Sequence, residues 1–246
     1  MSEKVIVITG ASSGMGKATA LKMAQKGYKV VLGARRENKL QEIKTEIEKN
    51  GGTAIYEVTD VTSATAVQKL ADKANEAFGR IDVWLNSAGI MPQSPLAEKR
   101  IEDWDNMIDI NLKGTLYGIS AALTYMVPQK FGHIINISSI AAHHVGVGSS
   151  VYSATKAGVN SISEGLRQEM AQMKTNVRVT VVSPGAIKTN LLSSITSKDA
   201  KGFITDFYNQ YAIPVERIAQ VIADAIDMPA DTALNEIIVR PTAQEM

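Results

Sequence analysis

Cysteine is absent from the 246-residue sequence, which excludes disulfide bonds, thiolate nucleophiles and cysteine-ligated metals. Long apolar runs are absent as well, because no window approaches the roughly 18 consecutive apolar residues that a transmembrane helix needs. The chain begins MSEKVIVITG and runs directly into a strand pattern, without the layout of a secretory signal peptide. We therefore expect a cytoplasmic protein that has no membrane partner.

An excess of charge of one sign is also missing. The 26 lysines and arginines nearly balance the 25 aspartates and glutamates, which leaves a formal net charge of +1. Since no long basic run occurs either, nucleic acid is not an expected partner. His143 and His144 are adjacent but have no carboxylates close to them in the sequence, so they do not predict a metal site, and we expect no metal. The remaining composition, with 45% hydrophobic residues, is typical of a globular protein with a substantial core.

Seven short runs rich in β-branched residues recur along the chain and predict strands. They are KVIVIT (4–9), YKVVLGA (28–34), TAIYEVT (53–59), IDVWLN (81–86), HIINIS (133–138), VRVTVVS (177–183) and NEIIVR (235–240). Helical stretches with charged faces lie between most of these runs, for example at residues 37–50 and 63–79. This alternation predicts one α/β domain over residues 1–246, a doubly wound parallel seven-stranded Rossmann sheet with helices on both faces.

A glycine-rich turn, TGASSGMG at residues 9–16, follows the first predicted strand and precedes the first predicted helix. Gly10 permits a tight turn, Gly14 lets the backbone approach a ligand, and Gly16 lets the helix lie close to the sheet. The exposed amides and the positive end of the helix favour a pyrophosphate. The position of the turn therefore predicts a dinucleotide-binding site. The other turn residues assigned to this site are Ser12, Ser13 and Met15.

The end of the second predicted strand indicates which dinucleotide is bound. Rossmann folds that bind NAD usually place an acidic residue there to bind the ribose 2′-hydroxyl. In this chain the position is Ala34, and Arg35 and Arg36 follow it. A carboxylate would repel a 2′-phosphate, whereas a guanidinium binds one bidentately. We therefore expect NADP(H) as the cofactor, with Arg35 as the main contact and Arg36 assisting.

A tyrosine and a lysine, Tyr152 and Lys156, stand four residues apart in a stretch with helical periodicity and so share one helix face. A lysine cation about 4 Å from the phenol would lower the tyrosine pKa by up to about three units, into the range useful for acid–base catalysis. Many helices contain such a pair without a catalytic role, so the pair alone does not decide the function.

Together these motifs resemble the short-chain dehydrogenase/reductase family, over residues 4 to 240. The residues that carry the resemblance are Thr9-Gly10-x-x-x-Gly14-x-Gly16, Asp60-Val61, NSAG at 86–89, Asn111, Ser139, Tyr152-x-x-x-Lys156 and Pro184-Gly185. Ser87 departs from the family pattern, which usually has a second asparagine there. Within the family, the chain is similar to NADP-dependent reductases that include 3-hydroxy-acid and serine dehydrogenases.

The resemblance implies a role for each of these residues. Tyr152 is implied as the general acid and base, Lys156 as its partner and a ligand of the nicotinamide ribose, and Ser139 as the residue that binds the substrate oxygen. Asn111 is implied to break its helix locally and to hold a water linked to the lysine; a buried, satisfied asparagine is the alternative, and Ser138 is the alternative to Ser139. The further implied cofactor contacts are Asp60 and Val61 at the adenine, Asn86, Ala88 and Gly89 in the cleft, and Pro184, Gly185, Ile187 and Thr189 at the nicotinamide.

We therefore expect an oxidoreductase that transfers a hydride between NADP(H) and a carbonyl or secondary alcohol. Reduction of a 3-oxoacyl thioester is one alternative, and a non-catalytic dinucleotide-sensing regulator on the same fold is another. The expected walls of the substrate cleft are residues 90–97, 140–151 and 190–212. The last range contains Leu191, Leu192 and Ile195 and no obvious carboxylate-binding arginine, which favours a fairly apolar ketone, diketone or 3-oxo ester.

Two further expectations concern larger parts of the molecule. Residues 186–214 form the least regular stretch, long and polar with scattered apolar residues, and we expect a substrate lid there. The helices expected around residues 101–128 and 152–174 carry more apolar surface than one sheet face can cover. A second subunit would cover the rest, and the family resemblance also implies assembly. We expect a homotetramer, with a dimer as the fallback.

Overall fold

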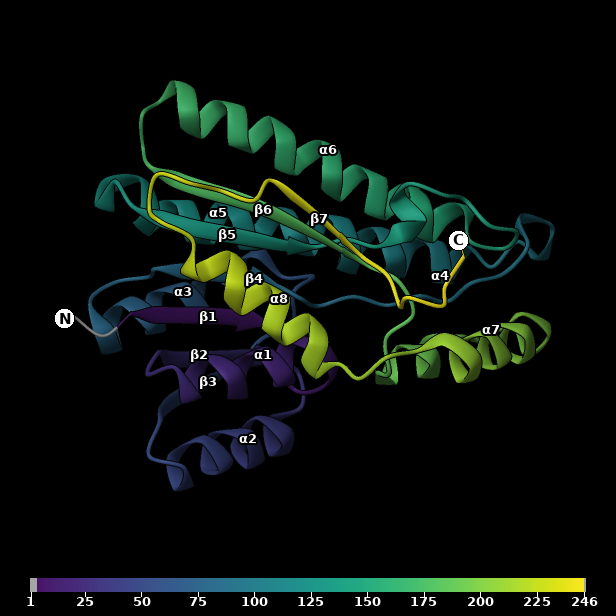
Figure 1. The fold of residues 1–246 in the computed structure, drawn as a ribbon, viewed down its shortest axis with the longest axis horizontal. Coiled ribbons are helices and arrows are strands. Elements are labelled where there is room, and N and C mark those ends of the chain that lie inside the picture. The colour runs from purple at the N-terminus through teal and green to yellow at the C-terminus, as the bar shows by residue number, and fades with distance from the viewer. Residues whose placement is uncertain (1–3, 246) are drawn as a thin grey trace.

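The predicted strands form one parallel sheet (Figure 1). The computed structural model describes residues 4–245, apart from the side chains of residues 198–200 and 203. The strands are β1 (Val5–Thr9), β2 (Lys29–Ala34), β3 (Thr53–Val58), β4 (Val83–Asn86), β5 (Gly132–Ile137), β6 (Val177–Pro184) and β7 (Glu236–Val239). They lie in the order β3-β2-β1-β4-β5-β6-β7, and each neighbouring pair is parallel. The predicted seven-stranded parallel sheet is confirmed.

Helices cover both faces of this sheet, as predicted. The α-helices are α1 (Gly14–Gln25), α2 (Glu37–Lys49), α3 (Ala64–Phe78), α4 (Ile101–Met107), α5 (Gly114–Gln129), α6 (Ser150–Gln172), α7 (Lys198–Tyr211) and α8 (Glu216–Asp227). Four short segments accompany them: η1 (Leu96–Glu98), the π-helical η2 (Ile108–Lys113), η3 (Ile140–Ala142) and η4 (Asn190–Ser194). Helices α1, α2 and α8 pack on one face of the sheet, and α3, α5 and α6 pack on the other.

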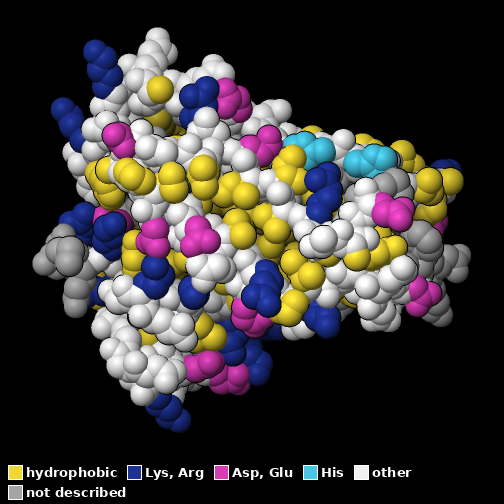
Figure 2. Space-filling view, in the orientation of Figure 1, with side chains coloured by type: hydrophobic (Ala, Val, Ile, Leu, Met, Phe, Trp, Pro, Cys, Tyr) yellow, Lys and Arg dark blue, Asp and Glu magenta, His cyan; other side chains and the backbone are white. Residues whose placement is uncertain are grey.

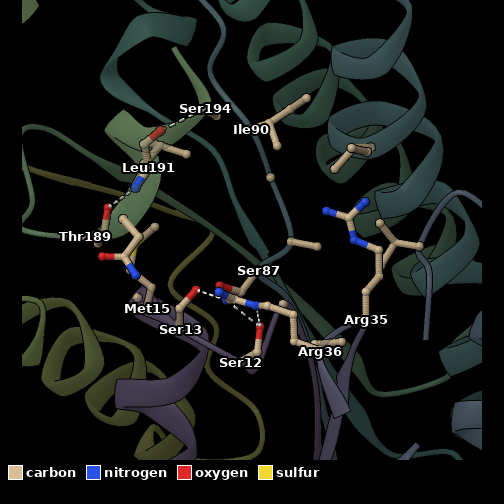
Figure 3. Close-up of a pocket in the computed structure, with 18 of the residues that line it drawn as sticks. Ser12, Ser13, Met15, Arg35, Arg36, Ser87, Ile90, Thr189, Leu191 and Ser194 are labelled. Carbon is tan, nitrogen blue, oxygen red and sulfur yellow. Dashed lines mark hydrogen bonds between the residues drawn. The ribbon is translucent and has the colours of Figure 1, made fainter. Parts of the chain in front are cut away.

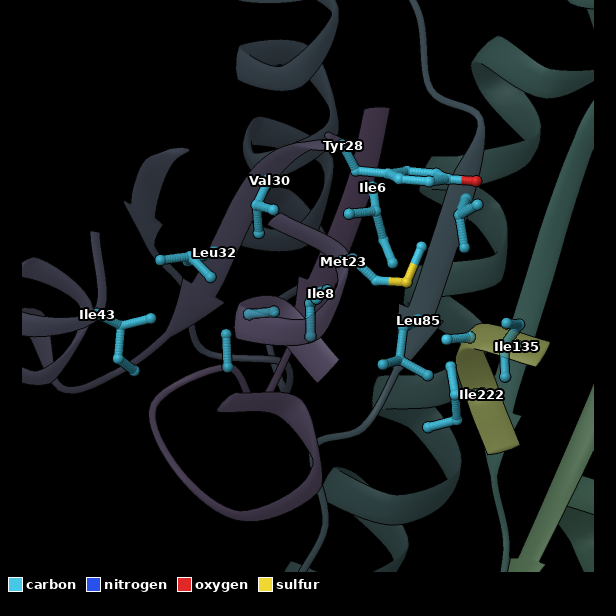
Figure 4. Close-up of a cluster of buried hydrophobic side chains, with 14 of the residues drawn as sticks. Ile6, Ile8, Met23, Tyr28, Val30, Leu32, Ile43, Leu85, Ile135 and Ile222 are labelled. Atoms are coloured by element: carbon cyan, nitrogen blue, oxygen red, sulfur yellow. The ribbon is translucent and has the colours of Figure 1, made fainter. Parts of the chain in front are cut away.

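Strand β1 illustrates why both faces are covered. All five of its residues, VIVIT, are buried, and successive side chains of a strand point to opposite faces. Ile6 and Ile8 therefore pack with Met23 of α1 and Ile222 of α8 (Figure 4), whereas Val5 and Val7 belong to the cluster under α3 and α5. A strand buried on both sides in this way is typical of a doubly wound parallel sheet.

The strand order reverses beside β1, and this reversal positions the candidate site. Strand β1 pairs with β2 on one side and with β4 on the other, and Thr9 is in register with both Gly33 and Asn86. The loops that follow these three strands therefore start at the same level. A crevice opens at such a point, beyond the carboxyl ends of the strands, and α7 lies on this side of the sheet (Figure 1).

Two stretches differ from the expectations. Residues 186–214 are not irregular, because they contain η4 and the regular helix α7. The helical period was present in Ile204, Phe207, Tyr208 and Tyr211, and the polar residues between them obscured it. The π-helical turn η2 divides the helix expected over residues 101–128 into α4 and α5, and η2 contains Asn111, the residue that the family resemblance implied as a local break.

The surface agrees with the balanced composition. On the face shown in Figure 2, positive and negative side chains are interspersed, with hydrophobic side chains between them. Among the helices of the described residues, none is long and apolar enough to cross a membrane.

Candidate active site

A cavity of about 400 Å³ lies beyond the carboxyl ends of β1, β2 and β4 (Figure 3). The glycine-rich turn, the end of β2, the loop after β4 and residues 189–194 form its walls. The predicted cofactor residues that line the cavity are Gly10, Ser12, Ser13, Gly14, Met15, Arg35, Arg36, Asp60, Val61, Ala88, Gly89 and Thr189. The structure thus brings together predicted residues from five separate parts of the chain.

The glycine-rich turn is shaped for close approach of backbone to ligand. Gly10 has a φ of +67°, and a Cβ atom there would lie 2.7 Å from the backbone of Ala88, so another residue would not fit. Ser13 is the N-cap of α1, but its side chain makes no capping hydrogen bond, and no acidic residue lies in the first turn. The amides of a first helical turn have no partner within the helix. This end of α1 therefore suits a phosphate.

The two arginines after β2 point in different directions (Figure 3). The Nη2 atom of Arg36 donates hydrogen bonds of 2.9 Å to Ser12 Oγ and to Ser13 Oγ, which places its guanidinium against the glycine-rich turn. Arg35 extends along the other side of the cavity and acts electrostatically on Asp60. The cavity is consequently flanked by two guanidinium groups.

Asp60 is held as a carboxylate at the edge of the cavity. Its Oδ1 atom accepts hydrogen bonds from the Thr62 amide (3.0 Å) and from Thr62 Oγ1 (2.8 Å). Burial raises the pKa of this carboxyl, but the bonds from Thr62 and the charge of Arg35 outweigh burial, so its pKa lies below the ordinary value. An orientated, ionised carboxylate can accept hydrogen bonds from a ligand.

Tyr152 and Lys156 lie side by side on α6, and each is only 5% exposed. Lys156 Nζ lies 5.8 Å from the centre of the Tyr152 ring and donates a 2.9 Å hydrogen bond to the carbonyl oxygen of Ile137. The hydroxyl of Ser139, just beyond β5, forms a hydrogen bond with Tyr152. Ser139 and Lys156, which the sequence singled out together with Tyr152, therefore both lie close to the tyrosine.

Asn111 lies in the π-helical segment η2 and is completely buried. Its side chain joins η2 to the loop after β4, because Oδ1 accepts from the Ile90 amide (2.9 Å) and Nδ2 donates to the Ile90 carbonyl (3.0 Å). A Cβ atom at Gly89 would lie 3.3 Å from Asn111 Oδ1 and 3.6 Å from Lys156 Nζ. Asn111 and Lys156 thus approach the same point from two elements, and a π-helical turn at a functional site is a recurrent arrangement.

The same combination of fold and motifs occurs in known proteins. The family model for the short chain dehydrogenases matches residues 4–200 of the chain. The chain belongs to the short chain dehydrogenase family. The chain is 48% identical to an uncharacterized oxidoreductase of Listeria monocytogenes over 244 residues. These residues cover 99% of this chain and 98% of that protein.

Solved structures of dehydrogenases have the same fold. The closed form of a serine dehydrogenase complexed with NADP+ is 31% identical with a TM-score of 0.90, covering 98% of this chain and 96% of that one. A short-chain dehydrogenase/reductase from Burkholderia phymatum in complex with NAD is 26% identical with a TM-score of 0.90, covering 96% and 89%. Both dinucleotides therefore occur on this fold.

Burial determines the charge states of the tyrosine and lysine in this short chain dehydrogenase. Burial raises the pKa of the Tyr152 phenol above its ordinary value, the nearby Tyr208 raises it further, and the hydrogen bond with Ser139 opposes the rise. Burial also lowers the pKa of the Lys156 ammonium to about 8. The expected lowering of the tyrosine pKa is therefore wrong, because burial of the phenol is the largest influence on its pKa.

Asn86 also differs from the expectation. Its side chain does not line the cavity; instead, Oδ1 accepts from Trp84 Nε1 and Nδ2 donates to Asn136 Oδ1, each at 2.8 Å. Ser87, the departure from the family pattern, lines the cavity in its place. Asn86 thus joins β4 to β5 beneath the site, because alternate residues at the end of a strand face opposite ways.

The residues expected at the nicotinamide lie where β6 ends. Pro184 is the last residue of β6, and Gly185 follows it. Ile187 is 3% exposed and pairs with Ile213 in an isolated parallel bridge, while Thr189 reaches the cavity wall. Gly16 lies beneath the turn and does not line the cavity, which fits its expected role in helix packing.

Several contacts around Tyr152 were not foreseen from the sequence. Met91 and Met107 pack with Tyr152 and Ile195 in one buried cluster, and Tyr208 of α7 packs against it. The Met91 amide donates to Ser194 Oγ (2.9 Å), which ties η4 to the loop after β4. His143 Nε2 lies 3.1 Å from Glu236 Oε1, a carboxylate 93 positions along the chain that only the fold brings near. No periodicity in the sequence indicates contacts between such distant segments.

Proposed function

We propose that the protein is an NADP(H)-dependent oxidoreductase that interconverts a ketone and a secondary alcohol. The observation that carries this proposal is the position of Gly89 between two groups of residues. Gly89 lines the cavity that Arg35 and Arg36 flank, and a Cβ atom at Gly89 would lie 3.6 Å from Nζ of Lys156, which is buried on α6 with Tyr152. A dinucleotide spans a crevice of this kind with its pyrophosphate at the helix terminus.

The residues at the adenosine end fit NADP(H). Ala34, Arg35 and Arg36 all line the cavity, so an alanine stands where an NAD site carries an acid, and two cations follow it. The serine hydroxyls that hold Arg36 keep its guanidinium orientated for bidentate binding of a 2′-phosphate. The pyrophosphate would lie against the amides of residues 14 and 15, and Asp60 would accept from the adenine edge.

The residues at the other end supply proton transfer and orientation. The bound nicotinamide supplies or accepts the hydride at the substrate carbon. Ser139 binds the substrate oxygen, and Tyr152 gives that oxygen a proton as negative charge develops on it. Lys156 supports the developing phenolate and binds the ribose hydroxyls, while Asn111 holds a water that links the lysine to solvent. The raised pKa of Tyr152 leaves its phenol protonated near neutrality, the state from which it gives a proton to the substrate oxygen.

The surroundings of Tyr152 favour an uncharged substrate. Met91, Met107 and Ile195 are buried against it, with Leu191 and Leu192 of η4 packed around them. The Tyr208 phenol lies near Tyr152 and raises its pKa further. A fairly apolar ketone, diketone or 3-oxo ester therefore fits better than a substrate with a free carboxylate.

Residues 186–214 would act as a lid over this substrate site. Their apolar side chains, including Ile195, Ile204 and Tyr208, cover Tyr152. A substrate must displace this cover to reach the tyrosine hydroxyl, and the cover then excludes water from the reaction.

The proposal is tested by following oxidation of NADPH and of NADH with a panel of simple ketones, diketones, 3-oxo esters, 3-oxo acids and 3-oxoacyl thioesters. We expect turnover of apolar ketones with NADPH. Charge-assisted bonds to a phosphate contribute about 1.5–3 kcal/mol, so Arg35→Ala and Arg36→Ala should each reduce the preference for NADPH by about ten- to a hundredfold. Equal use of NADH by the wild type, unchanged in both variants, would refute the cofactor assignment.

Arg35→Asp should reverse the preference, because a carboxylate repels the 2′-phosphate and can accept from a 2′-hydroxyl. Arg167→Asp is a suitable control, since Arg167 lies on α6 and forms a surface ion pair with Glu164. Its cofactor preference should equal that of the wild type.

A further inference from the structure

The C-terminal tail returns to the candidate site through Gln244. This side chain is 6% exposed, and its Oε1 atom accepts a 2.9 Å hydrogen bond from the backbone amide of Ala186. The backbone amide of Gln244 donates a hydrogen bond to the Pro241 carbonyl oxygen (2.9 Å) and closes a turn. The Gln244 side chain points from this turn toward Ala186. The C-terminus lies on the same side of the sheet as α7 (Figure 1).

The loop after β6 and the tail fit each other closely. A Cβ atom at Gly185 would collide with Gln244 Oε1 and would lie 3.1 Å from Pro241 Cδ. The Gly185 amide donates to the Val239 carbonyl of β7 (2.7 Å). Any residue larger than glycine at position 185 would therefore displace the glutamine amide or the loop.

The opposite side of the same loop is held by the segment after α7. The Ile213 amide donates to the Ala186 carbonyl (3.2 Å), and the Lys188 amide donates to the Ile213 carbonyl (2.9 Å). Ala186 thus has both its backbone polar groups engaged, one by the tail and one by the segment after α7. Ala186 is 1% exposed, so its amide has no access to solvent as a replacement partner.

We propose that Gln244 is a positioning residue for the nicotinamide half of the dinucleotide site. This role rests on the proposed function, with Pro184, Gly185, Ile187 and Thr189 at the nicotinamide as the family resemblance implies. Gln244 accepts the hydrogen bond of the Ala186 backbone amide. This bond fixes the backbone conformation of the loop between Pro184 and Thr189. Removing the acceptor leaves a buried N–H group without a partner, which costs enough free energy to move the loop.

The test compares two probes that share only the adenosine half of the site. Binding of NADPH is measured by its fluorescence, and binding of adenosine 2′,5′-bisphosphate, which has no nicotinamide, is measured by calorimetry. Gln244→Met keeps the length of the side chain and removes the amide oxygen. We expect the Kd for NADPH to rise about tenfold in this variant, while the Kd for the bisphosphate changes less than about twofold.

Two matched variants complete the design. Gln244→Glu retains an oxygen acceptor and should bind NADPH nearly as the wild type does. Gln220→Met makes the same substitution at an exposed position of α8, where the amide donates to Asp224, and should change neither Kd.

Each result decides the proposal. An unchanged NADPH affinity in Gln244→Met refutes the positioning role. Equal weakening of the binding of both probes also refutes it, because that result shows a general loss of structure. A wild type that binds NADH but not NADPH refutes the cofactor assignment alone, and the comparison is then made with NADH and adenosine 5′-phosphate. A wild type that binds no dinucleotide refutes the proposed function and this role together.

Discussion

Tyr152 is buried next to Ser139. Its phenol is protonated at neutral pH, because burial raises its pKa further above that range. Lys156 lies one helical turn away and would stabilise the phenolate that forms when the proton leaves. The tyrosine hydroxyl is therefore the group whose removal should affect chemistry and leave binding intact.

Tyr152→Phe should lower kcat for ketone reduction by about 10²- to 10⁴-fold, the usual contribution of a general acid. The Kd for NADPH should stay near the wild-type value, because the ring and its packing are kept. Steady-state kinetics and NADPH fluorescence measure the two quantities. Tyr56→Phe, which removes an exposed hydroxyl on β3 that donates to Glu37, is the control and should behave as the wild type. Near wild-type turnover in Tyr152→Phe would contradict the assignment.

Lys156 should determine how activity depends on pH. Its pKa is lowered to about 8, so the side chain is a cation below this pH and neutral above it. The Tyr152 pKa is raised, so the phenol stays protonated throughout the same range. Activity in the reducing direction should therefore fall as the pH rises through about 8, as the positive charge is lost.

The measurement is the pH profile of kcat/KM for ketone reduction, which reports the free enzyme. In Lys156→Arg the charge persists to high pH, so the falling limb should disappear from whatever activity remains. A wild-type profile that stays flat to pH 10 would show that the lysine charge is not required.

Among the elements, three hydrogen bonds connect residues 194–197 of the proposed lid to neighbouring segments. Ser194 Oγ accepts from the Met91 amide, Thr196 Oγ1 donates to Asp103 of α4 (2.6 Å), and Ser197 Oγ donates to Glu98 of η1 (3.2 Å). Asp103 is itself held by Arg100, whose Nε donates to the same Oδ2 atom (2.6 Å). The segment after η4 is thus attached to α4 and η1 by polar contacts at its edge.

Thr196→Val should weaken this attachment while keeping the shape of the side chain. We expect the KM for the ketone to rise about three- to tenfold, since one bond to a carboxylate at the surface is lost, with little change in NADPH affinity. Amide hydrogen exchange should become faster in residues 190–211. Thr205→Val, which removes a bond to a backbone carbonyl within α7, is the matched control. An unchanged KM together with unchanged exchange would show that these contacts do not hold the lid.

At the scale of the whole molecule, apolar side chains remain exposed where assembly is expected. Ile108 of η2 is 40% exposed and Leu116 of α5 is 41% exposed, and Ile238 of the edge strand β7 is 44% exposed. Unpaired edge strands and apolar helix faces are places where identical subunits associate. The two sets lie on different elements, which suits two separate interfaces.

We expect a homotetramer, and otherwise a dimer, of the 26.5 kDa chain in light scattering at micromolar concentration. Leu116→Glu should shift the protein to smaller species, because a buried carboxylate without a partner opposes association. Activity should fall with it, since α6 carries Tyr152 and Lys156 and packs beside η2 and α5. A fully active wild-type monomer would disprove this expectation.

Local patterns in the sequence were enough to predict the sheet, because strands such as VIVIT are apolar throughout. Tyr152 and Lys156 stand one helical turn apart, but the family resemblance was needed to add Ser139 and to make the three a candidate catalytic group. The role of Gly10 was also predicted from the sequence, because a tight turn between a strand and a helix requires a residue without a side chain.

The directions of side chains and their pKa shifts depend on the tertiary structure. The pKa of Tyr152 is raised by burial in a cluster with residues of η4 and α7, which lie about forty or more residues further along the chain, and burial lowers the pKa of Lys156. Asn86 turns toward Asn136, and Gln244 reaches Ala186 across 58 positions. Desolvation and long-range hydrogen bonds depend on which segments meet in space, and no periodic pattern in the sequence indicates which distant segments meet.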